Sequence, residues 1–181
     1  MSSAIPIRHS LFGSHDYGLV SVGSQTIKRN WSEAKNYLKG SASDWLPTVD
    51  AVFRGIRSEC KNANWDGQGA FAITDQVIGN AEKVVETLFA LLPTGTPAPD
   101  VVPEADGEIC ISWLVETSRM FSLSIGAHGK VNFAGQFGKE GEVHAWQPID
   151  SSSRRALEES LQDVARYVGK LYPPALSRPA A

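Results

Sequence analysis

The stretch that decides the fold is residues 109–137, ICISWLVETSRMFSLSIGAHGKVNFAGQF, in which apolar side chains alternate with small or polar ones. Alternation with a period of two is typical of β-strands that bury one face. Short turns at residues 117–118 and 128–129 separate three such runs, and a fourth run follows at residues 143–147. Consecutive strands joined by short connections pair antiparallel. We therefore predict an antiparallel meander of four to five strands with helices packed on one face.

The two faces of this meander differ in character, because residues two apart in a strand share a face. One face is apolar and must be buried; it comprises Ile109, Ile111, Trp113, Phe121, Leu123, Ile125, Val131 and Phe133. The opposite face carries Cys110, Ser112, Ser122, Ser124, Asn132 and Gln136, with Leu114, Met120 and Ala134 among them. A solvated face would carry more Lys and Glu. We predict that the helices leave this second face uncovered, and that it contacts a partner chain, a second subunit or the N-terminal arm.

Helices are predicted before and after the meander along the chain, because apolar residues recur there at helical spacing. The first expected helix begins around residues 43–47, with Ser43 as cap and Pro47 in the first turn, and runs to about residue 60. The others are residues 76–92 with Thr74 as cap and 151–171 with Asp150 as cap. Gly79 lies inside the second helix, where it costs up to about 1 kcal/mol relative to Ala, which suggests close packing at that point. An N-terminal helical part, a run of strands and a C-terminal helix indicate an α+β domain.

Composition narrows the class of protein. The 181 residues include 17 Lys or Arg and 20 Asp or Glu, a net charge of −3, and 42% are hydrophobic, as in ordinary globular domains. We expect a flexible arm over residues 1–27, one domain over 28–174 and a disordered tail over 175–181. No apolar run approaches the roughly 20 residues of a membrane span, and no secretory signal pattern is present. A cytoplasmic protein is expected, without the clustered basic face that binds nucleic acid.

The loop Asn64-Trp65-Asp66-Gly67-Gln68-Gly69-Ala70 is the most distinctive segment outside the periodic runs. Gly, Asn and Asp are turn residues, and Asp66 is expected to bond the backbone amides of Gly67 and Gln68. Trp65 either packs back into the core and fastens the loop, or serves as an exposed anchor for a partner. The spacing of the two glycines does not make a dinucleotide-binding turn, because no strand precedes them.

Recognised catalytic and metal-binding patterns are missing from the sequence. It contains no P-loop, no nucleophile elbow and no HExxH motif. None of the four histidines lies within metal-ligand spacing of a second His or Cys on one element. His144 projects on the same side of its strand as Trp146, and Cys110 lies among apolar residues, which favours an inert thiol. No metal and no cofactor are predicted.

The loop and the strands together resemble a known group of sequences. After the Asn64–Ala70 motif come an amphipathic helix ending in Leu-Leu-Pro, Asp106-Gly-Glu-Ile109 leading to Trp113, and a histidine-bearing strand at His144. This combination resembles small uncharacterised bacterial proteins with an NWDGxGA loop and a DGxIxxxW strand, over residues 60–150. The resemblance implies a bacterial cytoplasmic protein of the sort found near mobile elements, toxin–antitoxin genes and defence genes, and it brings no established activity. That group has HG where this chain has His144-Ala145.

Two functions are compatible with these observations. The first is non-enzymatic binding of another protein, encoded by a neighbouring gene, by an antitoxin-like or phage-defence accessory factor; a homo-oligomer is left open. The candidate binding residues are Asn64, Trp65, Asp66, Gly67, Gly69, Ser122, Gln136, His144 and Trp146. The alternative is a small hydrolase in which Asp66 and His144 form an acid/base pair, which requires that they lie within about 10 Å of each other.

Overall fold

The structure is a computed structural model that describes residues 45–172. Five strands form one antiparallel sheet in the order β1-β2-β3-β4-β5. The strands are β1 (Asp100–Pro103), β2 (Ile109–Glu116), β3 (Arg119–Ile125), β4 (Lys130–Phe137) and β5 (Glu142–Pro148). The helices are α2 (Leu46–Glu59), α3 (Asp75–Leu91) and α4 (Arg154–Leu171), with a short 3₁₀ turn, η2 (Gly138–Glu140), between β4 and β5. The predicted α+β meander is confirmed.

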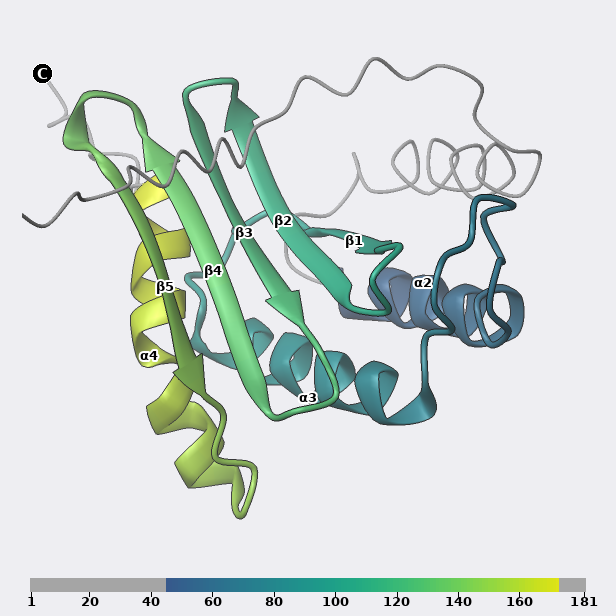
Figure 1. Ribbon diagram of the computed structural model, residues 1–181. Helices are drawn as coiled ribbons and strands as arrows, with labels where there is room; N and C mark the ends of the chain where they lie inside the picture. Colours follow the sequence, from purple (N-terminus) through teal and green to yellow (C-terminus); the bar gives the residue numbers. More distant parts are fainter. Residues whose placement is uncertain (1–44, 173–181) are drawn as a thin grey trace, which may run out of the picture.

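The helices form a second layer on one side of the sheet (Figure 1). Helix α2 contacts β1, α3 contacts β2 and β3, and α4 contacts β3 and β4. Helix α3 also packs against both α2 and α4, so it joins the helical layer together. The prediction that helices cover one face of the sheet is confirmed for the part of the chain that the structure describes.

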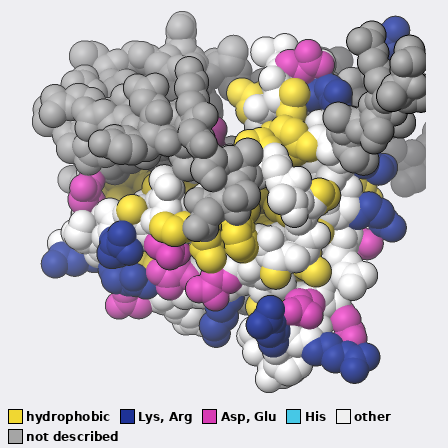
Figure 2. All heavy atoms as spheres, turned by 180° about the vertical axis from the view of Figure 1, so that it is seen from behind, with side chains coloured by type: hydrophobic (Ala, Val, Ile, Leu, Met, Phe, Trp, Pro, Cys, Tyr) yellow, Lys and Arg dark blue, Asp and Glu magenta, His cyan; other side chains and the backbone are white. Residues whose placement is uncertain are grey.

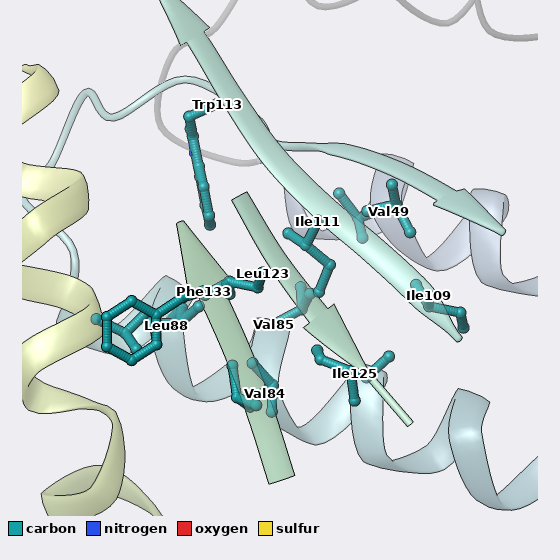
Figure 3. Close-up of a cluster of buried hydrophobic side chains, with 14 of the residues drawn as sticks. Val49, Val84, Val85, Leu88, Ile109, Ile111, Trp113, Leu123, Ile125 and Phe133 are labelled. Carbon is teal, nitrogen blue, oxygen red and sulfur yellow. The ribbon is translucent and has the colours of Figure 1, made fainter. Parts of the chain in front are cut away.

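The core lies between these two layers. All eight residues predicted for the apolar face are at most 7% exposed. Figure 3 shows Val84, Val85 and Leu88 of α3 next to side chains from β2, β3 and β4. At the α4 end, the rings of Phe121, Phe133 and Phe137 surround Tyr167, with centroids 5.8–5.9 Å from the tyrosine ring. The hydrophobic pattern in the strands and helices therefore accounts for the arrangement of the two layers.

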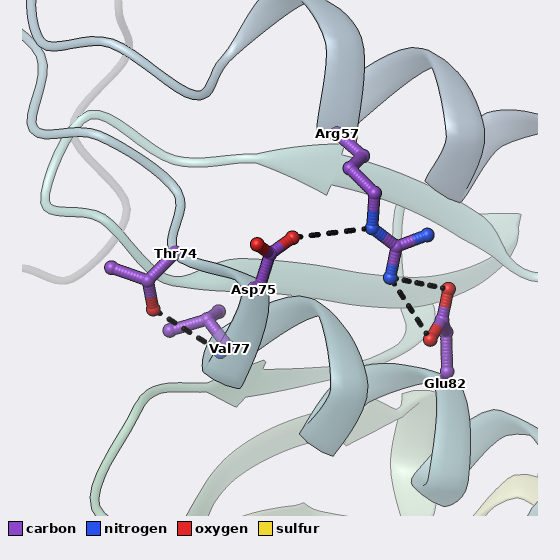
Figure 4. Close-up of polar contacts among 5 residues, drawn as sticks. All are labelled: Arg57, Thr74, Asp75, Val77 and Glu82. Atoms are coloured by element: carbon purple, nitrogen blue, oxygen red, sulfur yellow. Dashed lines mark hydrogen bonds and ion pairs between the residues drawn. The ribbon is translucent and has the colours of Figure 1, made fainter.

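Helix α3 begins as the sequence predicts. The Thr74 hydroxyl accepts a hydrogen bond from the Val77 amide at 3.3 Å, which satisfies one of the unpaired N–H groups of the first turn (Figure 4). The Arg57 guanidinium of α2 lies 3.3 Å from Asp75 and 3.1 Å from Glu82 of α3. These contacts are partly exposed, so they contribute little to the free energy of unfolding.

The other two predicted helix caps are wrong. Helix α2 has Trp45 as its N-cap, and the buried indole donates to the Thr96 carbonyl at 3.1 Å; Ser43 lies outside the described residues. Helix α4 is capped by Ser153, whose hydroxyl accepts from the Ala156 amide at 3.1 Å. Asp150 instead accepts from the Ser152 amide at 2.9 Å and shapes the turn before the helix. Asp and Ser are comparable caps, so composition alone does not choose between them.

The expectation of close packing at Gly79 is also wrong. A Cβ added at this position would meet no atom within 4 Å, and the residue is half-exposed. The glycine whose missing side chain does matter is Gly135 in β4, where a Cβ would lie 2.6 Å from the Phe121 ring and 2.9 Å from the Phe137 ring.

The predicted arm at residues 1–27 and the tail at 175–181 lie outside the described residues. Within residues 45–172, no helix combines the length and the apolar character needed to cross a membrane.

Candidate functional site

The side of the sheet away from the helices, here called the open face, is formed by alternate residues of all five strands. It comprises Asp100 and Val102 of β1, Cys110, Ser112 and Leu114 of β2, Met120, Ser122 and Ser124 of β3, Lys130, Asn132, Ala134 and Gln136 of β4, and Glu142, His144 and Trp146 of β5. No helix among residues 45–172 packs on it. The predicted uncovered face is therefore the one that the described structure leaves uncovered.

The two central rows of the open face consist of short, uncharged side chains, and the Glu108 carboxylate reaches them by accepting a hydrogen bond from the Ser124 hydroxyl. The strand register aligns Ser112, Ser122 and Ala134 in one row across β2, β3 and β4. The next row holds Cys110, Ser124 and Asn132. All but Asn132 are half-buried, because neighbouring strands flank each short side chain. Such a centre is shallow and offers little obstruction to an approaching surface.

Larger and charged side chains lie around this centre. Val102, Leu114 and Trp146 are 40%, 58% and 62% exposed. Lys130 and Glu142 are exposed at the two ends of the β4–β5 pair. The Lys130 Nζ lies 5.0 Å from the centroid of the Trp146 ring, which places an ammonium over an aromatic face.

Four of the predicted binding residues come together on the open face. Ser122 lies opposite Ala134, and Ala134 lies opposite His144. Trp146 lies opposite Asn132, and Gln136 opposite Glu142. Lys130, Glu142 and Val102 are not among the predicted binding residues. Lys130 and Glu142 begin alternating strands, which is the signal that finds them, whereas the sequence DVVP of β1 shows no alternation.

The other candidate residues, Asn64–Gly69, lie elsewhere. The Phe71 amide donates to the Ala105 carbonyl at 2.9 Å, which fastens this loop beside the turn between β1 and β2. His144 is on β5, at the opposite edge of the sheet. Three strand spacings separate β2 from β5, roughly 14 Å. The described structure therefore does not bring Asp66 and His144 together as an acid/base pair.

The polar side chains of the loop at residues 64–70 form hydrogen bonds within the loop itself. Asn64 has a φ of 63°, and its side-chain oxygen accepts from the Gly69 amide at 2.8 Å. Asp66 accepts from the amides of Gln68 at 2.8 Å and Ala70 at 3.1 Å. The expected bond to Gln68 is present, whereas the Gly67 amide donates to the Asn64 carbonyl at 3.0 Å instead. These bonds, led by that from Gln68, lower the pKa of Asp66, so its carboxylate is a weak base.

Trp65 is half-buried and packs against the core. Its indole N–H donates to the Phe71 carbonyl at 2.9 Å, across the base of the loop. This geometry favours the first of the two alternatives, in which the ring fastens the loop. The exposed apolar residue of this region is Phe71, 67% exposed, which the sequence analysis did not single out.

Trp65→Ala is expected to lower the free energy of unfolding by about 2 kcal/mol. This is less than the 3–5 kcal/mol typical of a fully buried aromatic residue, because Trp65 is only partly buried in the native state. Trp65→Phe keeps most of the packing and loses one hydrogen bond, so it should cost only about 1 kcal/mol. Urea unfolding of the two variants and the wild type measures both values. Equal stability of Trp65→Ala and wild type would contradict the fastening role.

The two thiols are poor nucleophiles. Burial raises the pKa of Cys110 to about 12, with smaller contributions from the carboxylates of Glu104, Asp100 and Asp106. Burial and the neighbouring Glu59 raise the pKa of Cys60 to about 11. Both therefore stay protonated at neutral pH, and the thiolate is the reactive form. Within residues 45–172, no three His, Cys, Asp or Glu side chains are grouped to hold a metal ion.

The helix side of the molecule is mixed in charge. Figure 2 shows Lys and Arg side chains interspersed with Asp and Glu over the described residues. Ion pairs account for part of this pattern, for example Arg154 with Glu158 at 2.8 Å and Arg155 with Glu159 at 2.9 Å. A surface with both signs interspersed lacks the basic footprint of a nucleic-acid-binding domain.

Comparisons with known proteins found no match: no protein-family model, curated protein or solved structure matches this chain. The resemblance to the NWDGxGA group stays a prediction. The open face, defined by strand register and exposure, is the candidate site that the geometry supports best.

Proposed function

We propose that this protein is a protein-binding factor and that its partner docks on the open face of the sheet. The observation that carries the proposal is the distribution of side chains on that face. The side chains of its central rows are short and uncharged, with one carboxylate, that of Glu108, bonded to Ser124, while exposed apolar residues and the other charges lie at the margins. Protein–protein interfaces have this organisation, with a centre depleted in charge and a polar rim.

The margin supplies the side chains that give binding energy in such interfaces. Trp146 and Leu114 are exposed on different strands of the same face, at 62% and 58%. Tryptophan is enriched among residues that dominate binding free energy. Lys130 carries a positive charge on this face, whereas Glu142, Asp100 and Glu108 carry negative charges. Such charges orient a partner and do not attract polyanions.

The resemblance described above suggests the kind of partner. A product of a neighbouring gene is the first candidate, with this chain acting as an antitoxin-like or defence-accessory factor in the cytoplasm. The alternative hydrolase loses its support, because its two proposed residues lie at opposite edges of the sheet and the pKa of Asp66 is lowered.

The double variant Ser122→Lys/Gln136→Lys tests the proposal. It places two ammonium groups in or beside the central rows, where a docked partner would leave them desolvated. We expect binding of the co-expressed neighbouring gene product, measured by isothermal titration calorimetry, to weaken at least about tenfold. The free energy of unfolding should change by less than roughly 0.5 kcal/mol per site, as for surface residues.

A matched control adds the same charge on the helix side. Ser58 of α2 and Gln162 of α4 are exposed and have the same residue types as the pair on the open face. Ser58→Lys/Gln162→Lys should leave the affinity unchanged within about twofold. An equal loss in both double variants, or no loss in the first, would contradict docking on the open face.

A further inference from the structure

The outer edge of β5 is the longer of the two edges of the sheet. Strand β5 has seven residues and pairs with β4, and no other strand of residues 45–172 lies beyond it. The opposite edge strand, β1, has four residues and ends in Pro103. Proteins commonly protect edge strands by making them short, by a bulge, or by charged residues and proline on the strand. On β5 the acidic residue and the proline are at the two ends, Glu142 and Pro148.

The hydrogen bonds at both ends of the β4–β5 pair show which backbone groups point outward. The Ile149 amide donates to the Gly129 carbonyl directly opposite it, and the Phe137 amide donates to the Gly141 carbonyl directly opposite. Hydrogen-bonded and non-hydrogen-bonded pairs alternate along an antiparallel ladder. Odd-numbered residues of β5 therefore bond to β4. The N–H and C=O groups of Glu142, His144 and Trp146 point to the outer edge.

The outward N–H and C=O groups of β5 in one copy can pair with the same groups in a second copy. When a second copy pairs antiparallel with His144 opposite its own counterpart, Glu142 lies opposite Trp146 of the second copy. Each facing pair then exchanges two backbone hydrogen bonds, so every outward N–H of the strand finds an acceptor. Pro148, which has no N–H to offer, falls outside the paired segment.

The side chains at this edge are complementary in charge in the same register. Lys130 Nζ lies 5.0 Å from the centroid of the Trp146 ring. A residue directly opposite Trp146 has its Cβ about 4.5–5.5 Å from that of Trp146. Glu142 of the second copy would thus approach Lys130, and the two-fold symmetry would repeat the contact. The exposed ring of Trp146, 62% accessible in one copy, would be partly covered.

We propose that a second copy of this chain pairs with β5 antiparallel about a two-fold axis at His144. The two sheets become one continuous sheet, and the two open faces lie side by side on it. This interface goes beyond the proposed function and does not depend on it.

Analytical ultracentrifugation of the full chain tests the pairing, and a dimer is expected for the wild type. Glu142→Lys and Lys130→Glu should each raise the dimer dissociation constant at least about tenfold. The charge swap Glu142→Lys/Lys130→Glu should restore it to within about threefold of the wild type. A wild-type monomer at about 100 μM, or a swap as weak as its single variants, would overturn the proposal.

A second pair of variants examines the backbone contacts and the register. His144→Pro removes an outward N–H without removing a bond to β4, and it should abolish the dimer, whereas His144→Ser should keep it. His144→Cys should form an intermolecular disulfide under mild oxidation, and Gln136→Cys, one strand away from the edge, should not. Circular dichroism confirms that each variant is folded. A folded His144→Pro that still dimerises like the wild type would contradict pairing through β5.

Discussion

Trp113→Ala is expected to lower the free energy of unfolding by about 3–5 kcal/mol, the usual cost of truncating a buried large aromatic residue. Trp113 is 2% exposed and is the largest of the fully buried side chains of the described core. Its indole N–H also donates to the Pro97 carbonyl at 3.1 Å, so the ring fastens the segment before β1 to the centre of the sheet. The truncation therefore opens a cavity and leaves that carbonyl without its partner.

The adjacent residue provides the control. Leu114 follows Trp113 in β2 but is 58% exposed on the open face. Leu114→Ala should change the free energy of unfolding by less than roughly 0.5 kcal/mol. Urea denaturation of both variants measures the difference. Similar losses at the two positions would contradict the assignment of the buried and open faces.

Gly135→Val is expected to cost about 3 kcal/mol, at the upper end of the range for overpacking. A Cβ at this position lies 2.6 Å from Phe121 Cδ2 and 2.9 Å from Phe137 Cζ, so both rings must move. Those rings also pack against Tyr167 of α4, with centroids 5.9 Å away in each case. The cost arises because the displaced rings lose contacts with the helix, not because of the backbone conformation.

Gly79→Ala, also a substitution of a glycine, is expected to stabilise the protein, in contrast to Gly135→Val. Gly79 lies inside α3 with open space around it, so a methyl group meets no neighbour. Alanine there should stabilise the protein by about 0.5–1 kcal/mol, because it reduces the freedom of the unfolded chain and favours the helix. Thermal unfolding of the two variants should move in opposite directions. A destabilised Gly79→Ala would contradict the packing described for α3.

The sheet is predictable because its signal is local and repeated. Alternation along residues 109–137 assigns each side chain to a face, and short turns determine which strands are neighbours. The buried face and the open face follow from those two facts. The helix caps are less predictable, because Asp150 and Ser153 are equally suitable by type and three-dimensional packing selects between them. For α2, the buried Trp45 occupies the cap position, which no cap preference indicates.

The candidate site was predictable in part. The grouping of Ser122, Gln136, His144 and Trp146 on one face follows from strand periodicity and is observed. The separation of Asp66 from His144 depends on strand order, since the loop precedes β1 and His144 lies on the last strand of the meander. The residues of β5 whose backbone groups point outward are those that do not bond to β4. Residue types do not determine whether these are the odd- or the even-numbered residues.

Site-specific photo-cross-linking is the most direct measurement of where a partner docks. A photoreactive phenylalanine analogue is placed at Ser122, in the centre of the open face, or at Glu86, exposed on α3 on the helix side. Both proteins are expressed in the native host and irradiated in the cell. We predict a cross-link from position 122 to the neighbouring gene product, and none from position 86. A cross-link to that product from position 86 and none from position 122 would contradict docking on the open face.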